Sequence, residues 1–177
     1  MARDYRPKSS RLAIDANVLS LLLVYNHCVC TNISVQRRER ILVETRGRDD
    51  GLPTERFNDL WEVFCSVTRR MVTQHIIAET LNCRRGWLRD NREAARRSAV
   101  SLVQEFAVEE RQCRLMDLAA NAAYLKALIE LGPADAGLLY VAESIGATLI
   151  SDDGPLLQWA YSHGVPAYPV SGIHLLA

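Results

Sequence analysis

The sequence lacks an excess of either charge, because 21 Lys and Arg residues balance 21 Asp and Glu residues. Bulk electrostatics therefore neither favour nor exclude a nucleic-acid partner, and attraction for a polyanion has to come from local patches. The chain also lacks low-complexity tracts and internal repeats. With 49% hydrophobic and 24% charged residues among 177, the composition is that of an ordinary soluble globular protein.

Long hydrophobic runs are lacking as well. The run VLSLLLVY (18–25) is interrupted by Ser20 and is far shorter than the ~20 residues of a membrane-spanning helix. The N-terminal MARDYRPKSSR carries Asp4 and leads into a strand-like segment, which is not the layout of a secretory signal. The five cysteines, an odd number, are expected to be reduced thiols. We therefore expect a cytoplasmic protein with no membrane partner.

Short apolar segments alternate with helical patterns along the chain. This alternation predicts βαβ units and an α/β fold in which a mainly parallel sheet has helices on both faces. Residues 1–10 are expected to form an N-terminal tail and residues 11–177 a single domain. The predicted strands are 11–15, 71–73, 114–118, 147–151 and 165–170, the last at a sheet edge because of its prolines.

Helices are predicted in the intervening segments from the spacing of their apolar residues. Two of them have an expected inward stripe, which comprises Val100, Val103, Phe106 and Ala107 in one helix and Leu125, Leu128 and Ile129 in the other. The predicted helices are 16–28, 36–48, 55–70, 74–83, 84–111, 121–131, 132–146 and 155–164.

Acidic residues recur where strands end and helices begin. Asp15 follows the first strand, Asp152 and Asp153 follow the fourth, Asp135 lies in a first helical turn, and Glu79 lies within a helix. Each has an ordinary explanation: a helix N-cap, a favourable helix dipole or a solvated helical acid. In open parallel sheets, however, functional sites form at the carboxyl ends of the strands, which is where these acids gather.

Clustered carboxylates repel one another and become partly protonated unless a cation holds them. Ligand sets made only of oxygen select hard ions, here Mg²⁺ or Mn²⁺. Such ions activate water and stabilise the charge of a phosphodiester under attack. The acids therefore predict a metal-dependent phosphoryl-transfer site, most naturally that of a nuclease.

Asp152 and Asp153 are expected to differ in role. Side chains alternate between the two faces of a strand, so only one of the pair should face a cleft, unless the strand has already ended. The other would be free to cap the helix that begins near Pro155.

Four segments carry a resemblance to a known family: LAIDANVLSLLL, VTQHIIAETLN, LGPADAGLLYVAESIGATLISDD and GVPAYPV. In this order they resemble PIN-domain proteins, including toxin ribonucleases of the VapC type. The resemblance implies a three-layer α/β/α fold and a Mg²⁺- or Mn²⁺-dependent endoribonuclease acting on RNA. It further implies an antitoxin protein and a homodimer as candidate partners. The segment around 28–70 is longer than in compact toxins, which makes it a helical insertion and weakens the toxin assignment.

The resemblance also implies roles for individual residues. Asn17 would orient the first acid, and Ser151 would take the place of the usual Thr or Ser. Asp152 falls on a variable position and would be the less favoured ligand. The metal-binding and catalytic acids would be Asp15, Glu79, Asp135 and Asp153.

A row of arginines is a candidate RNA- or partner-binding surface. Helical spacing aligns Arg85, Arg89, Arg92 and Arg96, and arginine suits bidentate phosphate contacts. The competing interpretation, which we favour, is a solvated face neutralised by neighbouring acids.

Three alternatives remain open at this point. A haloacid-dehalogenase-like phosphatase needs a second Asp where Asn17 stands, and a receiver domain needs its acidic pair after the first strand. Both are disfavoured. A catalytically silent PIN-like scaffold that binds RNA or a protein is the third, although all four acids are present.

Overall fold

The structure is a computed structural model that describes residues 10–46, 55–83 and 86–173. A sheet of five strands, all parallel, lies at its centre in the order β3-β2-β1-β4-β5. The strands are β1 (Arg11–Ile14), β2 (Arg69–Thr73), β3 (Val108–Arg111), β4 (Thr148–Ser151) and β5 (Ala167–Pro169). The predicted edge position of the last strand is confirmed.

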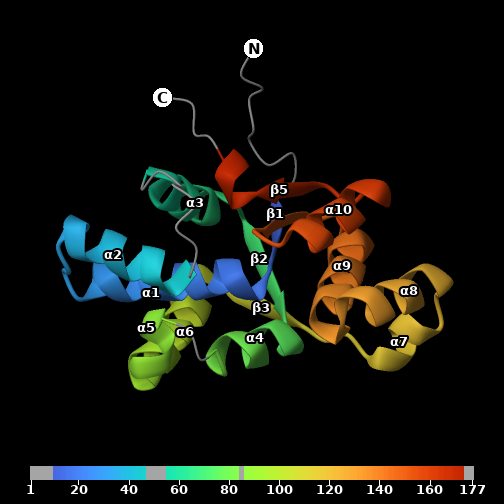
Figure 1. Cartoon of the computed structure of the whole chain (residues 1–177), viewed down its shortest axis with the longest axis horizontal. Helices are drawn as coiled ribbons and strands as arrows, with labels where there is room; N and C mark the ends of the chain where they lie inside the picture. The colour runs from blue at the N-terminus through green and yellow to red at the C-terminus, as the bar shows by residue number, and fades with distance from the viewer. Residues whose placement is uncertain (1–9, 47–54, 84–85, 174–177) are drawn as a thin grey trace, which may run out of the picture.

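Helices cover the sheet in two layers (Figure 1). In this view α1, α2, α5 and α6 lie on one side of β1 and β2, and α7, α8 and α9 lie on the other. The three-layer α/β/α architecture is thereby confirmed. The helices are α1 (Ala16–Cys30), α2 (Val35–Arg46), α3 (Glu55–Ser66), α4 (Gln74–Leu81), α5 (Gly86–Asp90), α6 (Arg92–Phe106), α7 (Leu115–Ala119), α8 (Ala122–Leu131), α9 (Pro133–Ile145) and α10 (Gly154–Ser162), with a 3₁₀ turn η1 at Val170–Gly172.

The helices in the described part of the chain are all too short or too polar to cross a membrane.

The central strands explain why acids at strand ends meet. Every residue of β4 is buried, as are Leu12 to Ile14 of β1, which is typical of parallel strands covered on both faces. Ile14 pairs with Ile150, so β1 and β4 end side by side. The chain passes to β2 on one side of β1, whereas β4 lies on the other, so this edge contains a topological switch point.

The predicted helix over 84–111 is wrong in its C-terminal part and is interrupted within. The described residues form two helices, α5 and α6, that meet at Asn91, and the last four predicted residues form strand β3. The left-handed Ala107, with φ of 49°, turns the chain from α6 into β3. The expected inward stripe is also wrong, because Val100 and Val103 are 55% and 53% exposed. Instead, α6 buries Ala95, Ser98 and Leu102.

Two further predictions on this side of the chain are wrong. The expected strand at 114–118 lies in helix α7. In α8 the buried residues are Tyr124 and Ala127, and Leu128 of the expected stripe is partly buried against the core. The other two, Leu125 and Ile129, are 40% and 76% exposed. The ring of Tyr124 packs against Trp159, and its hydroxyl donates to Glu143, so the larger aromatic side chain determines which face of α8 turns inward.

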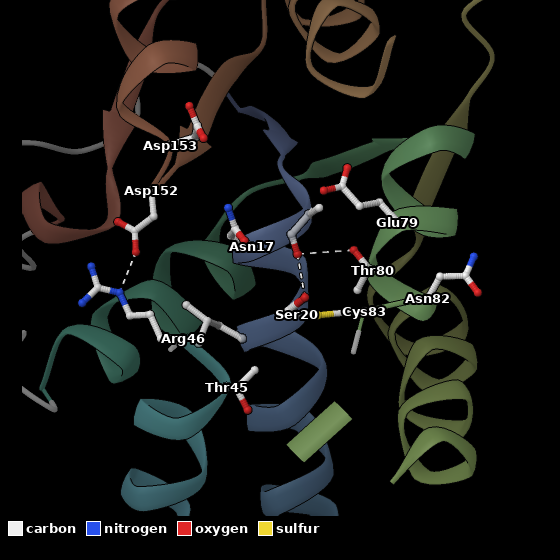
Figure 2. Close-up of a pocket in the computed structure, with 12 residues that line it drawn as sticks. Asn17, Ser20, Thr45, Arg46, Glu79, Thr80, Asn82, Cys83, Asp152 and Asp153 are labelled. Carbon is white, nitrogen blue, oxygen red and sulfur yellow. Dashed lines mark hydrogen bonds and ion pairs between the residues drawn. The ribbon is translucent and has the colours of Figure 1, made fainter. Parts of the chain in front are cut away.

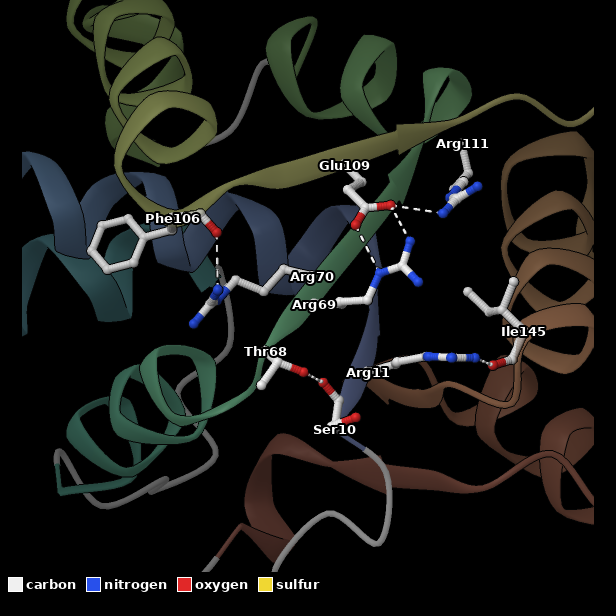
Figure 3. Close-up of polar contacts among 9 residues, drawn as sticks. All are labelled: Ser10, Arg11, Thr68, Arg69, Arg70, Phe106, Glu109, Arg111 and Ile145. Atoms are coloured by element: carbon white, nitrogen blue, oxygen red, sulfur yellow. Dashed lines mark hydrogen bonds and ion pairs between the residues drawn. The ribbon is translucent and has the colours of Figure 1, made fainter.

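The predicted helix at 55–70 ends earlier than expected, because its last residues belong to β2 (Figure 3). Arg69 forms two hydrogen bonds of 2.8 Å with Glu109 of the neighbouring strand. The guanidinium of the buried Arg70 donates to the carbonyls of Phe64, Cys65 and Phe106. Arg70 therefore caps the C-terminal ends of α3 and α6 together, where carbonyls lack helical partners.

Candidate active site

Asp15 is held rigidly at the end of β1. Its carboxylate caps α1 by accepting a 2.6 Å hydrogen bond from the backbone N–H of Val18, and its other oxygen accepts from the hydroxyl of Ser151. Only 2% of Asp15 is exposed. Burial raises the pKa of Asp15 to about 6, although the hydrogen bonds from Ser151 and Val18 oppose this rise. The N-cap explanation therefore holds for Asp15, and a cap of this kind is compatible with a functional role.

Ser151 links Asp15 to the second strand end. Besides donating to Asp15, its hydroxyl accepts a 2.9 Å hydrogen bond from the backbone N–H of Asp153. Asp153 in turn caps α10, accepting a 2.9 Å hydrogen bond from the N–H of Leu156. Among the described residues, Val18 and Ser151 thus orient Asp15, the role that the resemblance implied for Asn17. Asn17 itself is exposed on the first turn of α1.

Glu79 reaches the site from α4. Thr73 at the end of β2 caps this helix through a 3.4 Å hydrogen bond to the N–H of Ile76. The hydroxyl of Thr80 donates to the carbonyl of Ala16 over 3.3 Å, which ties α4 to the first turn of α1. Glu79 is exposed, as a helical acid ordinarily is, but it faces the cavity described below.

Asp135 lies where the charges of the other three acids reach it. It lies in the first turn of α9, beside Pro133, and is partly buried. Burial, followed by the charges of Asp15, Asp153 and Glu79, raises the pKa of Asp135 to about 7. The four acids come from four different parts of the chain, and three of them lie close enough to Asp135 for their charges to affect it.

The side chains are nevertheless not arranged as metal ligands. Within the described residues, no group of three or more His, Cys, Asp or Glu side chains is placed to hold a metal ion. Like charges repel, so the other carboxylates can lie near enough to Asp135 to raise its pKa without converging with it on a single point.

A cavity of about 640 Å³ is lined by two of the four acids, Glu79 and Asp153 (Figure 2). Asp15 and Asp135 are not among its lining residues. Polar side chains from α1, α2 and α4 line most of it, together with the acidic pair that follows β4. The lining residues are Ala16, Asn17, Ser20, Leu21, Thr45, Arg46, Glu79, Thr80, Asn82, Cys83, Asp152 and Asp153.

Asp152 and Asp153 both line this cavity, although strand alternation alone would turn only one of them toward a cleft. The stated exception applies, because β4 ends at Ser151 and strand alternation does not extend to the pair. Nor does the pair divide as expected, since Asp153 is itself the helix cap. Asp152 instead forms an ion pair with Arg46, over 2.7 Å from Nε to Oδ2.

Sequence reasoning missed Arg46. Nothing distinguishes this residue from the other arginines of the charged segment 36–48, and it lies 106 positions from Asp152. Its place as the last residue of α2 is a feature of the structure, because the predicted helix continued to residue 48.

The predicted row of arginines does not form one helical face. Arg89 belongs to α5 and pairs with Asp90 over 2.8 Å, whereas Arg92 and Arg96 are exposed on α6, beyond the break at Asn91. Arg85 lies outside the described residues. The pairing of Arg89 agrees with the solvated, neutralised surface that we favoured.

Comparison with known proteins adds no assignment. A scan against protein-family models matches no family, and searches of curated proteins and of solved structures find no significant match. The function therefore has to be argued from the site itself.

Proposed function

We propose that this protein is a metal-dependent endoribonuclease that hydrolyses phosphodiester bonds of RNA at the carboxyl edge of its sheet. The arrangement at the ends of β1 and β4 carries the proposal: Ser151 donates a hydrogen bond to Asp15 and accepts one from the backbone N–H of Asp153. The pKa of Asp135, raised first by burial and then by the charges of Asp15, Asp153 and Glu79, supports it. Carboxylates that interact across four elements are costly for the fold, and such a cost is typical of functional sites.

The chemistry of the donor set fits the expected ion. Carboxylate oxygens from Asp15, Glu79, Asp135 and Asp153 would hold Mg²⁺ or Mn²⁺, which prefer oxygen ligands. A bound ion would supply an activated water and neutralise charge on the phosphodiester.

The residues of the chain itself differ in how firmly they are placed. Asp15 and Asp153 are each fixed by a backbone N–H and are connected through Ser151, so they form a rigid half of the site. Glu79 is exposed and Asp135 is only partly buried. A site that is half fixed needs little rearrangement to reach a productive geometry.

The cavity supports a polar substrate larger than a single ion. Its volume of about 640 Å³ lies within the range of small-ligand sites, and hydroxyl, amide and charged side chains line it. These groups suit the sugar and phosphate of a nucleotide. An antitoxin partner and a homodimer stay predictions.

The test is cleavage of a labelled single-stranded RNA by the purified protein. We expect cleavage with Mg²⁺ or Mn²⁺ and none in chelator, and we expect Asp15→Asn and Asp135→Asn each to abolish it. Glu130→Gln is the matched control, because this exposed helical acid pairs with Lys126 and should leave cleavage unchanged. Activity that survives either Asn substitution, or that persists in chelator, contradicts the proposal. RNA binding without cleavage would instead indicate the silent scaffold.

A further inference from the structure

Acidic side chains outnumber basic ones in the cavity, which is unusual for a site that holds RNA. Three acids line it, namely Glu79, Asp152 and Asp153, and among its described lining residues Arg46 is the one basic side chain. An RNA strand entering this space brings further negative charge. A cation within the cavity is therefore the natural partner of a substrate phosphate.

The core places Arg46 there. It is the last residue of α2, whose Ile41 and Leu42 are buried and which packs against α1. Thr45, the preceding residue, is also buried and donates a 2.8 Å hydrogen bond to the carbonyl of Ile41. The end of α2 is therefore anchored, and with it the base of the Arg46 side chain.

Asp152 then fixes the guanidinium. Figure 2 shows the guanidinium of Arg46 turned toward the carboxylate of Asp152. Only 7% and 10% of the two side chains are exposed, so the pair is largely shielded from water. A shielded ion pair is a weak source of stability, because desolvation of the two charges offsets their attraction. Its position at a cavity is better explained by binding: a guanidinium carries five N–H donors in a planar fork and can contact a carboxylate and a phosphate together.

We propose that Arg46 binds a non-bridging phosphate oxygen of the RNA strand in this cavity, and that Asp152 is the positioning residue that holds Arg46 in place. This inference rests on the proposed function, and it gives the helical segment around 28–70 a role in substrate binding. It also separates the acidic pair: Asp153 belongs to the metal site and Asp152 to the phosphate contact.

Binding of a short fluorescent single-stranded RNA, measured by anisotropy in chelator over a range of salt concentrations, tests the contact without cleavage. We expect Arg46→Gln to weaken binding about tenfold and to lower the slope of log affinity against log salt by about 0.7, the value for one phosphate contact on a single strand. Arg114→Gln is the matched control, because Arg114 is exposed, pairs with Asp117 and lies outside the cavity. Equal effects of the two substitutions would overturn the inference, as would absence of RNA binding by the unmodified protein.

Arg46→Lys carries the same test if Arg46→Gln fails to fold, as judged by thermal melting. Lysine keeps the positive charge but lacks the planar set of N–H donors of a guanidinium. We therefore expect the slope of log affinity against log salt to be retained and the affinity for RNA to fall. Unchanged affinity in Arg46→Lys would contradict a guanidinium contact.

The positioning role of Asp152 is tested by cleavage kinetics with Mn²⁺. We expect Asp152→Asn to raise KM more than it lowers kcat. We also expect the double variant Asp152→Asn/Arg46→Gln to have the same kcat/KM as Arg46→Gln alone, because both substitutions remove the same phosphate contact. Additive losses would contradict the positioning role. The wild-type protein could bind RNA through Arg46 and never cleave it. That result would refute the nuclease proposal and support the Arg46–phosphate contact, so failure of the one proposal is distinguishable from failure of the other.

Discussion

Ser151 donates a hydrogen bond to Asp15 across the two central strands of the sheet, and the same hydroxyl accepts one from the backbone of Asp153. One buried side chain therefore connects two acids that lie more than a hundred residues apart in sequence. The bond to Asp15 also lowers the pKa of that acid, which burial raises. Ser151 thus favours the ionised form of Asp15.

Replacement of Ser151 by Ala should raise the pKa of Asp15 further, because the charged carboxylate loses a donor. It should also cost about 1–3 kcal/mol of unfolding free energy, since buried polar groups lose their partner. Carboxyl chemical shifts followed with pH measure the first effect and urea unfolding the second. Ser144→Ala is the control, because its hydroxyl donates to the carbonyl of Val141 within its own helix, and we expect a change below ~0.5 kcal/mol. An unaltered Asp15 pKa would contradict the arrangement.

Stability without divalent metal should fall as pH rises from about 4 to about 7. The folded pKa values of Asp15 and Asp135, about 6 and about 7, lie above the ordinary value of 3.8. The folded state therefore binds more protons than the unfolded state in this window, and the free energy of unfolding decreases with pH. Each tenfold change in the acid constant corresponds to about 1.4 kcal/mol. Urea unfolding in chelator at a series of pH values measures this slope.

Asp135→Asn should flatten that slope and make the protein more stable than wild type at pH 8, because a neutral side chain removes one of the repelling charges. The exposed Glu130→Gln should leave the slope unchanged. A wild-type stability that rises over pH 4–7, or an Asp135→Asn variant with the wild-type slope, would show that the acids do not interact in this way.

Arg70 and Arg69 are adjacent in β2 but should respond differently to replacement by Met. Arg70→Met leaves the carbonyls of Phe64, Cys65 and Phe106 without their donor and should cost ~3 kcal/mol. Arg69→Met removes a more exposed pair with Glu109 and should cost less than ~1 kcal/mol. Thermal or urea unfolding compares the two variants, and equal losses would contradict the cap on α3 and α6.

The sequence predicts much of this architecture because local patterns determine it. Strand ends marked by Asp15 and Asp153 meet in space once the sheet is parallel, since the carboxyl ends of neighbouring strands share an edge. Asp135 could be placed there because Pro133 marks the start of its helix.

Other features depend on contacts between distant segments and are not visible in local patterns. The local pattern predicts Arg70 as the end of a helix, whereas it lies in β2. Its burial becomes favourable only when the ends of α3 and α6 meet around it, and no local pattern shows that contact. Arg46 lies beside Asp152 through the packing of α2 on α1, which no residue spacing encodes. The break between α5 and α6 at Asn91 is likewise not marked by a proline in the sequence.

Binding of Mn²⁺ is the most direct test of the central claim that Asp15, Glu79, Asp135 and Asp153 form one metal site. Titration of the purified protein with Mn²⁺ at pH 8, followed by the electron paramagnetic resonance of the free ion, measures binding without RNA. The account predicts saturable binding that Asp15→Asn and Asp135→Asn each abolish and that Glu130→Gln preserves. Wild-type protein that leaves all the Mn²⁺ free, or variants that bind it as well as wild type, would contradict the account.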